Sequence, residues 1–405
     1  MLTYQYTARN SATGQKVTSE LQAESEQIAA KLIREEGLSP INIEAVDEKN
    51  TGFSKHFNKV HAKDRVLFSR QLSTLINAGL PLVQSLRSVA NQTTSKPLKL
   101  AISKIIADVE GGATLSVSMS KYPQIFNKVY VNLITAGEAS GTLDKALDRL
   151  AVQQEKDAEL ISKVRGAMIY PIIVLVVMFA VVLFMVVSVL PQVQELYKDL
   201  PGANLPFLTR ILLSISHFIT KYWWLLLILL GLGIFFTTRW ARTLGGKRAV
   251  DKFKMRAWPI GPLFMKMYMA RFARTGTTLV SSGVPLIQTL EITGEAVNNI
   301  HIAESLQKAT EKVKGGKALS EALTNDRNFL ELVPNMLRIG EQSGTIEQML
   351  SKTADYYEHE VDNQIKTIST VIEPVLMVVL GIMAFIIVAA VLLPIYGLAG
   401  KTIIK

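Results

Sequence analysis

Two long stretches of uncharged, mainly apolar residues most strongly constrain how this chain can fold. Met168 to Leu190 contains 23 such residues, and Val375 to Tyr396 contains 22. At about 1.5 Å per residue, a helix of this length crosses the roughly 30 Å hydrocarbon core of a bilayer. Because backbone polar groups find no partners in lipid, such segments must fold as helices. The sequence therefore predicts an integral membrane protein.

A third apolar stretch, Ile215 to Phe236, is less uniform. It carries His217 and Lys221 before its apolar run, and Tyr222 to Trp224 follow them. A lysine near the end of a span can extend its ammonium group to the interface, and aromatic residues are typical of that level. We interpret this stretch as a span. A buried helical hairpin is the alternative, because the clean apolar run is shorter.

Basic residues are unevenly distributed about these stretches and predict the orientation of the chain. The 44 basic and 34 acidic residues give a net charge of +10. The basic residues of the segment 191–214 are Lys198 and Arg210 alone, whereas seven basic residues follow the middle stretch. We therefore expect a cytoplasmic N-terminus and a periplasmic C-terminus, although Lys401 and Lys405 mildly oppose this. The seven residues are Arg239, Arg242, Lys247, Arg248, Lys252, Lys254 and Arg256.

This basic cluster also predicts an anionic partner. Anionic lipid of the inner leaflet is the favoured partner, because the cluster directly follows a predicted span. A nucleic-acid surface is the weaker interpretation, since no nucleic-acid-binding motif accompanies the charge. We expect no nucleic acid among the partners.

The second half of the chain repeats the first at a nearly constant offset. The offset is 204 residues at first and becomes 203 after the loss of one residue. In both copies a helical stretch of about 100 residues leads into a predicted span. We infer an internal duplication. The matching pairs are Phe68-Ser-Arg70 with Phe272-Ala-Arg274, Gly79-Leu-Pro81-Leu82 with Gly283-Val-Pro285-Leu286, Gly111-Gly112-x-x-Leu115-Ser116 with Gly315-Gly316-x-x-Leu319-Ser320, Gly137-Glu138-x-Ser140-Gly141-Thr142 with Gly340-Glu341-x-Ser343-Gly344-Thr345, Lys163 with Lys366, Pro171 with Pro374, and Pro191 with Pro394.

Each copy has the periodicity of a helix bundle. Phe68, Leu72 and Ile76 lie on one face of a predicted helix, which ends before Pro81. Leu100 to Val109 is a further predicted helix, ended by a glycine pair. The first 46 residues differ, because strands are predicted around Tyr4 to Ala8, Val17 to Leu21 and Ile41 to Ile43, with a helix from Ser25 to Glu36.

These patterns predict an all-α integral membrane protein with two tandem repeated cytoplasmic helix bundles, three transmembrane helices and a small N-terminal α+β module. The expected division of the chain is a ββαβ module at 1–46, a linker at 47–63, the first helical repeat at 64–167, the first transmembrane helix at 168–190, a periplasmic connector at 191–214, the second transmembrane helix at 215–238, the second helical repeat at 239–370, the third transmembrane helix at 371–396 and a periplasmic tail at 397–405.

Known motifs for catalysis or cofactor binding are missing from the sequence. The absence of cysteine excludes disulfides, thiolate metal sites and cysteine nucleophiles. Gly246-Lys247-Arg248 and Gly316-Lys317-Ala318 lack the remaining residues of a phosphate-binding loop. The acidic residues between Asp355 and Asp362, which include Glu358 and Glu360, form either a solvated helix face or a cation site. We expect no catalytic residue, no metal and no cofactor.

The Gly-Glu-x-Ser-Gly-Thr motif occurs once in each repeat. Its structural interpretation is a turn between helices, in which Gly137 and Gly340 permit a close approach and Thr142 and Thr345 cap the next helix. Its functional interpretation makes the glutamates contact points between helices or with a partner. The motif residues considered are Gly137, Glu138, Gly141, Gly340, Glu341 and Gly344.

A proline pair marks the entrances of two spans. Tyr170-Pro171 precedes one apolar run, and Glu373-Pro374 precedes the other. A carboxylate at the end of a span is costly and is a functional candidate, unless it lies at the level of the headgroups. Tyr170 replaces it in the first copy, so the fold does not require the charge.

The tandem repeats, their Gly-Glu-x-Ser-Gly-Thr and Gly-Gly-x-x-Leu-Ser motifs, and the proline pairs resemble the inner-membrane platform proteins of type II secretion and type IV pilus systems. The resemblance covers nearly the whole chain, including Gly37-Leu38-Ser39-Pro40. It is strongest to the secretion F proteins and to the biogenesis proteins of mannose-sensitive haemagglutinin-type pili, which the motifs do not separate.

The resemblance implies a non-enzymatic scaffold of the bacterial inner membrane. Such proteins form homo-oligomers, contact a cytoplasmic hexameric ATPase and other inner-membrane assembly proteins, and pass ATPase motion to pilins or pseudopilins. No catalytic residue follows from it. The competing hypothesis is a transporter subunit built from parallel repeats, which would require further spans and polar groups within the membrane.

Overall fold

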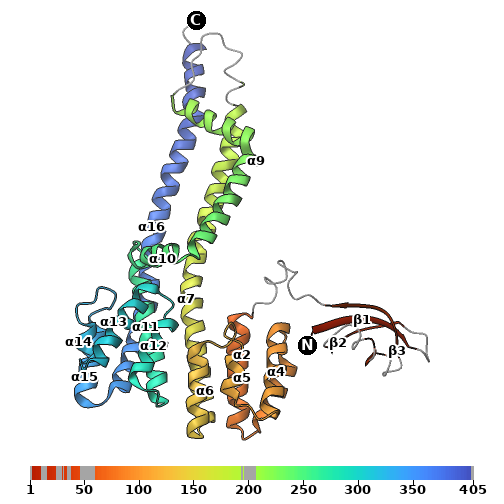
Figure 1. Ribbon diagram of the computed structural model, residues 1–405. Helices are drawn as coiled ribbons and strands as arrows, with labels where there is room; N and C mark the ends of the chain where they lie inside the picture. The colour runs from red at the N-terminus through yellow and green to blue at the C-terminus, as the bar shows by residue number, and fades with distance from the viewer. Residues whose placement is uncertain are drawn as a thin grey trace. The chain divides into compact units, whose positions relative to one another are not determined.

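The computed structural model describes residues 2–10, 16–23, 30, 32–33, 38–45, 60–192, 195 and 207–402 of the 405-residue chain. The chain divides into two compact units, Met1–Val60 and His61–Lys405. The larger unit contains both repeats and all the long apolar helices (Figure 1).

The first unit contains a three-stranded antiparallel sheet. Strands β1 (Leu2–Asn10), β2 (Lys16–Ala23) and β3 (Leu38–Ala45) are arranged in the order β2-β1-β3. The three predicted strands of the N-terminal module are thus confirmed. Of the predicted helix from Ser25 to Glu36, residues 30, 32 and 33 are described and are helical, and the others lie outside the described residues. Most of the expected linker at 47–63 also lies outside them.

The first repeat folds as a helix bundle around aromatic side chains. Phe126 lies between Phe68 and Tyr130, with ring centroids 5.7 and 4.9 Å apart, and all three are buried. One predicted boundary is wrong, because the helix expected from Leu100 begins at Lys96, with Pro97 in its first turn. The helices are α2 (Ala62–Asn77), α3 (Leu82–Gln92), α4 (Lys96–Glu110), α5 (Leu115–Ser120), α6 (Lys128–Ser140) and the first part of α7 (Leu143–Phe184).

The second repeat reproduces this bundle. Phe272 packs against Phe329 with ring centroids 5.3 Å apart, and these residues occupy the positions of Phe68 and Phe126 in the first repeat. The helices are α10 (Leu244–Arg256), α11 (Gly261–Ser281), α12 (Leu286–Ala296), α13 (Ile300–Lys314), α14 (Leu319–Leu323), α15 (Leu332–Ser343) and the first part of α16 (Ile346–Thr402).

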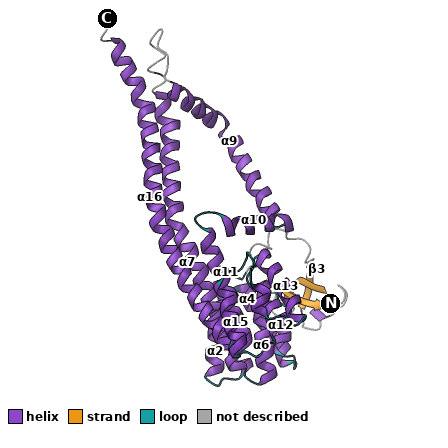
Figure 2. Cartoon of the chain, turned by 90° about the vertical axis from the view of Figure 1, so that its left-hand side faces the viewer, coloured by secondary structure: helices purple, strands orange, loops and turns teal. Residues whose placement is uncertain are grey.

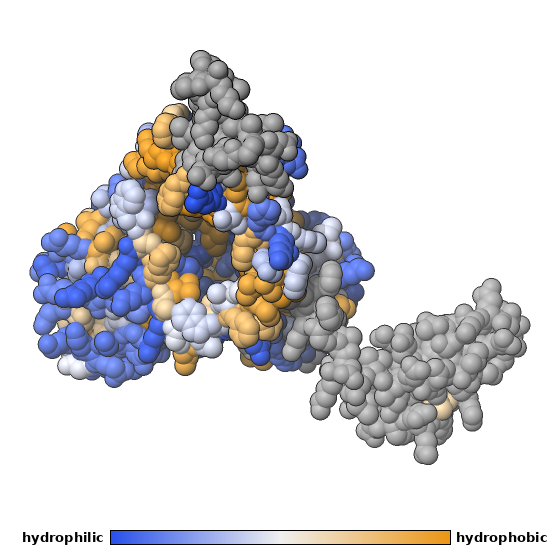
Figure 3. Space-filling model, turned by 90° about the horizontal axis from the view of Figure 1, so that it is seen from above, coloured by the Kyte–Doolittle hydropathy of each residue, from blue (hydrophilic) through white to orange (hydrophobic). Residues whose placement is uncertain are grey.

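Among the residues that the structure describes, three helices are long and apolar enough to cross a membrane. They are Leu143–Gln192, Thr209–Ala241 and Ile346–Leu392, and their apolar segments are almost entirely unburied within the chain. Seen from above, apolar side chains follow these helices and hydrophilic side chains cover the bundles (Figure 3). In the first of them, α7 passes into the π-helix η2 (Met185–Val189). The predicted fold class is confirmed.

Helix α9 (Phe207–Ala241) corresponds to the less uniform apolar stretch. It begins within the residues expected to form the connector and kinks at Tyr222, whose φ of −115° is not helical. Near its start, the Thr209 hydroxyl donates to the Ala390 carbonyl over 3.1 Å. Residues 227–240 are exposed on every side, and in Figure 2 this part of α9 diverges from α7 and α16. The exposed apolar length fits a membrane span and not a buried hairpin.

Candidate functional site

In each repeat, the Gly-Glu-x-Ser-Gly-Thr motif contacts the Gly-Gly-x-x-Leu-Ser motif. The carboxylate of Glu138 accepts hydrogen bonds from the backbone N–H groups of Leu115 and Ser116, at 2.5 and 3.1 Å, and from the Ser116 hydroxyl. These N–H groups open the short helix α5, so the carboxylate satisfies donors that lack helical partners. The Gly-Gly-x-x-Leu-Ser and Gly-Glu-x-Ser-Gly-Thr motifs are therefore the two sides of one contact.

Glu341 makes the same contact in the second repeat. Its carboxylate accepts from the N–H groups of Leu319 and Ser320, at 2.5 and 3.2 Å, and from the Ser320 hydroxyl. Both glutamates thus join helices within their own bundle. In both copies, the motif glutamate therefore has a structural role within its own bundle.

The motif glycines have two separate conformational roles. A Cβ atom on Gly137 would lie 2.5 Å from the Cβ of Ala146, and one on Gly340 would lie 2.9 Å from the Cα of Ile346. Gly141 and Gly344 end α6 and α15 in the left-handed region, with φ of +66° and +71°. The first pair permits the close approach of helices, and the second pair permits the turn.

The predicted capping by the motif threonines is wrong in its detail. Thr142 occupies the N-cap position of α7, but its side chain makes no capping hydrogen bond. Its hydroxyl lies 2.7 Å from that of Ser140, and the Thr345 hydroxyl lies 2.5 Å from that of Ser343. The two hydroxyls of each motif therefore pair with one another.

An arginine in each repeat ties its first long helix to the helix that enters the membrane. Arg70 forms a bidentate ion pair with Glu155, at 2.6 and 2.5 Å. In the second repeat, Arg274 lies 2.8 Å from Glu358 and 2.5 Å from Asp355. The arginines are part of the repeat that the sequence shows, whereas their acidic partners were not predicted. The signal was present, because Glu155 and Glu358 are also separated by 203 residues.

A polar seam joins α7 and α16 between the bundles and the apolar segments. Lys163 lies 2.9 Å from both Glu159 and Asp362, and Lys156 lies 3.6 Å from Glu358. These side chains line a cavity of about 230 Å³. The acidic residues between Asp355 and Asp362 are therefore paired with basic side chains. Over the part of the chain that the structure describes, no group of three or more His, Cys, Asp or Glu residues could hold a metal ion.

The proline pairs lie within continuous helices. α7 passes through Pro171, which is buried, whereas Tyr170 is exposed. Glu373 and Pro374 are both exposed on α16. Among the described residues, no hydrogen bond or ion pair joins any of these four residues to another.

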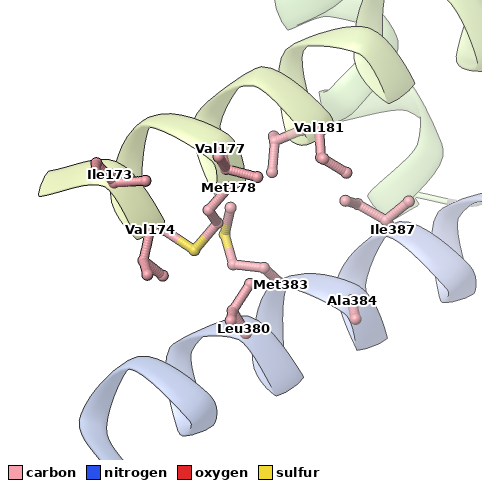
Figure 4. A pocket seen from close by; sticks show the side chains of 10 residues that line it. Ile173, Val174, Val177, Met178, Val181, Leu380, Met383, Ala384 and Ile387 are labelled. Carbon is pink, nitrogen blue, oxygen red and sulfur yellow. The ribbon is translucent and has the colours of Figure 1, made fainter. Parts of the chain in front are cut away.

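An apolar groove between α7 and α16 lies deeper in the membrane segment (Figure 4). It has a volume of about 300 Å³ and almost no polar surface. Met178 and Met383 face one another across it, and Val177 and Leu380 line it nearby (Figure 4). Thioether side chains adapt to partners of varied shape. This groove was not predicted, because the sequence of each wall indicates only a membrane helix.

Comparison with known proteins identifies the family. The profile of the family described as type II secretion system protein F matches residues 68–191 and 272–394, and the profile of its N-terminal domain matches residues 1–44. The chain belongs to the type II secretion system protein F family. The two matches coincide with the two repeats and their membrane helices.

Relatives within the protein F family come from two kinds of machine. The chain is 38% identical to the type IV pilus assembly protein PilC of Thermus thermophilus, over 99% of both chains. It is 35% identical to the type IV pilus assembly protein TapC of Aeromonas hydrophila, over 95% of this chain and 93% of the relative. It is 32% identical to the type II secretion system protein F of Pseudomonas aeruginosa, over 98% of this chain and 99% of the relative.

Proposed function

We propose that this chain is the inner-membrane platform of a type IV pilus assembly machine and couples a cytoplasmic hexameric ATPase to pilin assembly. In this role it carries force and catalyses no reaction itself. The proposal for a pilus is supported by the relatives, since those named for pilus assembly reach 38 and 35% identity, against 32% for the cited secretion protein. Other inner-membrane assembly proteins complete the machine.

The observation that carries this proposal is the continuity of each bundle with a membrane helix. α7 runs unbroken for 42 residues, or roughly 63 Å at about 1.5 Å per residue, from the Gly-Glu motif into the apolar segment. The Arg70–Glu155 and Arg274–Glu358 pairs brace the two long helices against their bundles. A displacement of a bundle by an ATPase would therefore be transmitted into the membrane.

We place the bundles in the cytoplasm and residues 191–214 in the periplasm. The basic residues from Arg239 to Arg256 support this orientation, and anionic lipid of the inner leaflet is their proposed partner. The one acidic residue among them, Asp251, is buried and accepts a hydrogen bond from the Ile300 N–H at 3.0 Å. The exposed charge of this segment is thus entirely positive.

The apolar groove between α7 and α16 is the proposed site for the membrane helix of a pilin. Its lining matches an apolar helix in chemistry, and it opens laterally between two helices that the bundles control. Glu373 is proposed to meet a charged pilin group in the membrane. If the substitution Glu373→Gln leaves pilus assembly at its normal rate, Glu373 has no such role.

Site-specific photocrosslinking in native membranes tests the groove. A benzophenone side chain at Val177, which lines the groove, should crosslink to pilin. The matched control is Phe179, which lies on the same helix, is 68% exposed and does not line the groove. Pilin capture from Val177 at several times the yield from Phe179 supports the proposal. Equal yields, or capture of lipid alone from Val177, would contradict it.

A secretion platform is the second candidate function. It is favoured by the match to protein F of Pseudomonas aeruginosa over 98% of this chain. The same crosslinking experiment separates the two candidates, because the captured subunit is a pilin in one case and a pseudopilin in the other.

A further inference from the structure

Helix α10 follows the apolar helix α9 after a single tight turn. The Thr243 N–H donates to the Trp240 carbonyl at 2.9 Å, and the Thr243 hydroxyl caps α10 by accepting from the Gly246 N–H at 3.1 Å. The candidate span in α9 ends at Ala241, so α10 begins at the level where the membrane segment ends. Both side views show α10 lying across the direction of the long helices (Figure 1, Figure 2). A helix so placed runs along the membrane surface.

Three large apolar side chains of this region are largely exposed. Leu244 at the start of α10 is 78% exposed, Phe253 near its end is 68% exposed, and Trp258, two residues after it, is 78% exposed. A single exposed apolar residue needs no explanation, but three of them beside the end of a span are typical of a segment that enters the membrane interface. Tryptophan in particular is enriched at that level.

The positive charge of this segment is mostly unpaired. Of its seven cations, Arg248 forms an ion pair with Glu304 at 2.5 Å, and the other six have no ion pair or side-chain hydrogen bond to a described residue. Lys252 and Arg256 follow Arg248 at intervals of one turn, and all three are exposed. Phe253 borders this basic stripe. Basic residues beside exposed aromatic and aliphatic side chains are the pattern of an interfacial amphipathic helix.

A cavity of about 380 Å³ lies beside Trp258. It is lined mainly by apolar side chains, among them that of Met265. Its two cations are Arg256 and Lys266, but Lys266 is bound to Glu360 at 2.8 Å. Arg256 is therefore the cation that is left to pair with a ligand. An apolar cavity next to an unpaired cation matches a phospholipid, which has an acyl chain for the cavity and a phosphate for the cation.

Polar contacts hold α10 to helix α13 of the second bundle. Asp251 is buried and accepts a hydrogen bond from the Ile300 N–H at 3.0 Å. Arg248 pairs with Glu304, and the Arg248 carbonyl lies 3.1 Å from Nε2 of His301. These contacts join α10 to the first two turns of α13. A membrane contact made by α10 would therefore restrain the second bundle.

The first repeat does not carry the same sequence pattern. By the repeat offset of 204, α10 corresponds to residues 40–52, of which residues 40–45 belong to strand β3. This segment contains three acidic residues, Glu44, Asp47 and Glu48, and one basic residue, Lys49. Its charge is thus opposite to that of α10. The basic and apolar pattern is a property of the second repeat alone.

We propose that α10 and Trp258 form an interfacial anchor that binds the second bundle, and not the first, to anionic phospholipid of the inner leaflet. Leu244, Phe253 and Trp258 enter the boundary between headgroups and acyl chains, and Lys252 and Arg256 bind lipid phosphates. This inference deepens the lipid contact proposed above for the basic residues, and it rests on the proposed placement of the bundles in the cytoplasm. It adds the apolar insertion and the restraint of one bundle.

Fluorescence quenching of the full-length chain in lipid nanodiscs tests the insertion. The chain has four tryptophans, and replacement of Trp223, Trp224 and Trp240 by phenylalanine retains Trp258 as its single indole. The nanodiscs contain phosphatidylglycerol, either unmodified or with bromine on the acyl chains next to the headgroup. We expect the brominated lipid to reduce the emission of Trp258 at least two-fold. Equal emission in the two kinds of disc would overturn the proposal.

The matched control places the single indole in the bundle, away from the membrane. Tyr356→Trp serves this purpose when all four native tryptophans are replaced by phenylalanine. Tyr356 is exposed on α16 and lies 19 residues before Val375, or roughly 28 Å at about 1.5 Å per residue. Brominated lipid should leave its emission nearly unchanged. Equal quenching of the two indoles would contradict an anchor at Trp258.

A charge reversal tests the commitment to anionic lipid. Lys252→Glu combined with Arg256→Glu should abolish at least half of the quenching of Trp258. The control, Lys99→Glu with Lys104→Glu, changes the net charge equally at two exposed positions of α4 and should leave the quenching unchanged. Unchanged quenching in the α10 variant, or equal loss in both variants, would overturn the proposal. The discs contain neither ATPase nor pilin, so failure here is distinguishable from failure of the platform function.

Discussion

Glu138 and Glu341 each hold the first two N–H groups of a short helix, and each directly follows a glycine that a neighbouring helix approaches closely. The carboxylate and the glycine act together, because the glycine brings two helices close and the carboxylate fixes a third. Charge-assisted hydrogen bonds of this kind contribute about 1.5–3 kcal/mol each to stability. The fold of each bundle thus depends on a few residues at one corner.

The substitution Gly137→Ala should destabilise the first bundle. Its added Cβ would lie 2.5 Å from the Cβ of Ala146 and 3.2 Å from the Cα of Leu143, so α6 and α7 would have to separate. We expect a loss of about 1–3 kcal/mol in the free energy of unfolding, measured by denaturant titration in detergent.

Gly166→Ala is the matched control for this substitution. Gly166 lies in α7 with no atom within 4 Å of an added Cβ, so alanine there should stabilise the helix by up to about 1 kcal/mol. Equal effects of the two substitutions would contradict the close-approach role of Gly137.

The Arg70–Glu155 pair should make the stability of the first bundle depend on pH. Hydrogen bonds from Arg70 hold the pKa of Glu155 below its usual value of 4.5. Glu155 lies in the part of α7 that precedes the apolar segment. Because the folded-state pKa is lowered, the stabilisation is fully present above the unfolded-state pKa and is lost as the pH falls through the folded-state pKa.

Comparison of the parent chain with Arg70→Met measures this dependence. The difference in melting temperature should be largest near pH 7 and should shrink as the pH falls towards about 3. A difference that stays constant from pH 7 to pH 3 would show that Arg70 acts through packing alone.

At the scale of elements, α7 and α16 are the features that connect the bundles to the membrane. Each passes through a proline at the membrane entrance without a break. Each is held against the first long helix of its bundle, α2 or α11, by an arginine. Lys163 and Asp362 then join the two helices to each other at 2.9 Å. These contacts make the pair of helices a stiff connection.

A break in α7 should uncouple the first bundle from the membrane. Ala167→Pro removes a backbone hydrogen bond and clashes with the carbonyl four residues earlier, at Lys163. We expect at least a tenfold loss of surface pili while the chain still inserts into the membrane. The control is Ala167→Ser, which keeps the helix. Normal piliation in Ala167→Pro would show that assembly does not require a continuous α7.

The sequence was sufficient to predict the elements but not their side-chain partners. The spans and the duplication follow from local composition and spacing, which is why the fold class was predicted. Arg70 and Glu155 are 85 residues apart, and their pairing depends on how α2 packs on α7. The kink at Tyr222 likewise has no local signal, since no proline or glycine precedes it within the turn. The groove at Met178 and Met383 arises only from the approach of two separate helices.

At the scale of the whole molecule, the chain is a duplicated helical protein of the inner membrane and belongs to the type II secretion system protein F family. The duplication gives two bundles and two long connecting helices, and α9 adds a third apolar helix between the repeats. This arrangement supports a platform on which a motor could act at one side and a membrane subunit could bind at the other.

Purification of the tagged full-length chain from native membranes, followed by mass spectrometry, tests this central claim most directly. An equally expressed, unrelated membrane protein with the same tag provides the control. The account predicts enrichment of a pilus-type ATPase and a prepilin with the tagged chain alone. Recovery of a clean homo-oligomer with neither of them would contradict the platform function and would favour a transporter subunit.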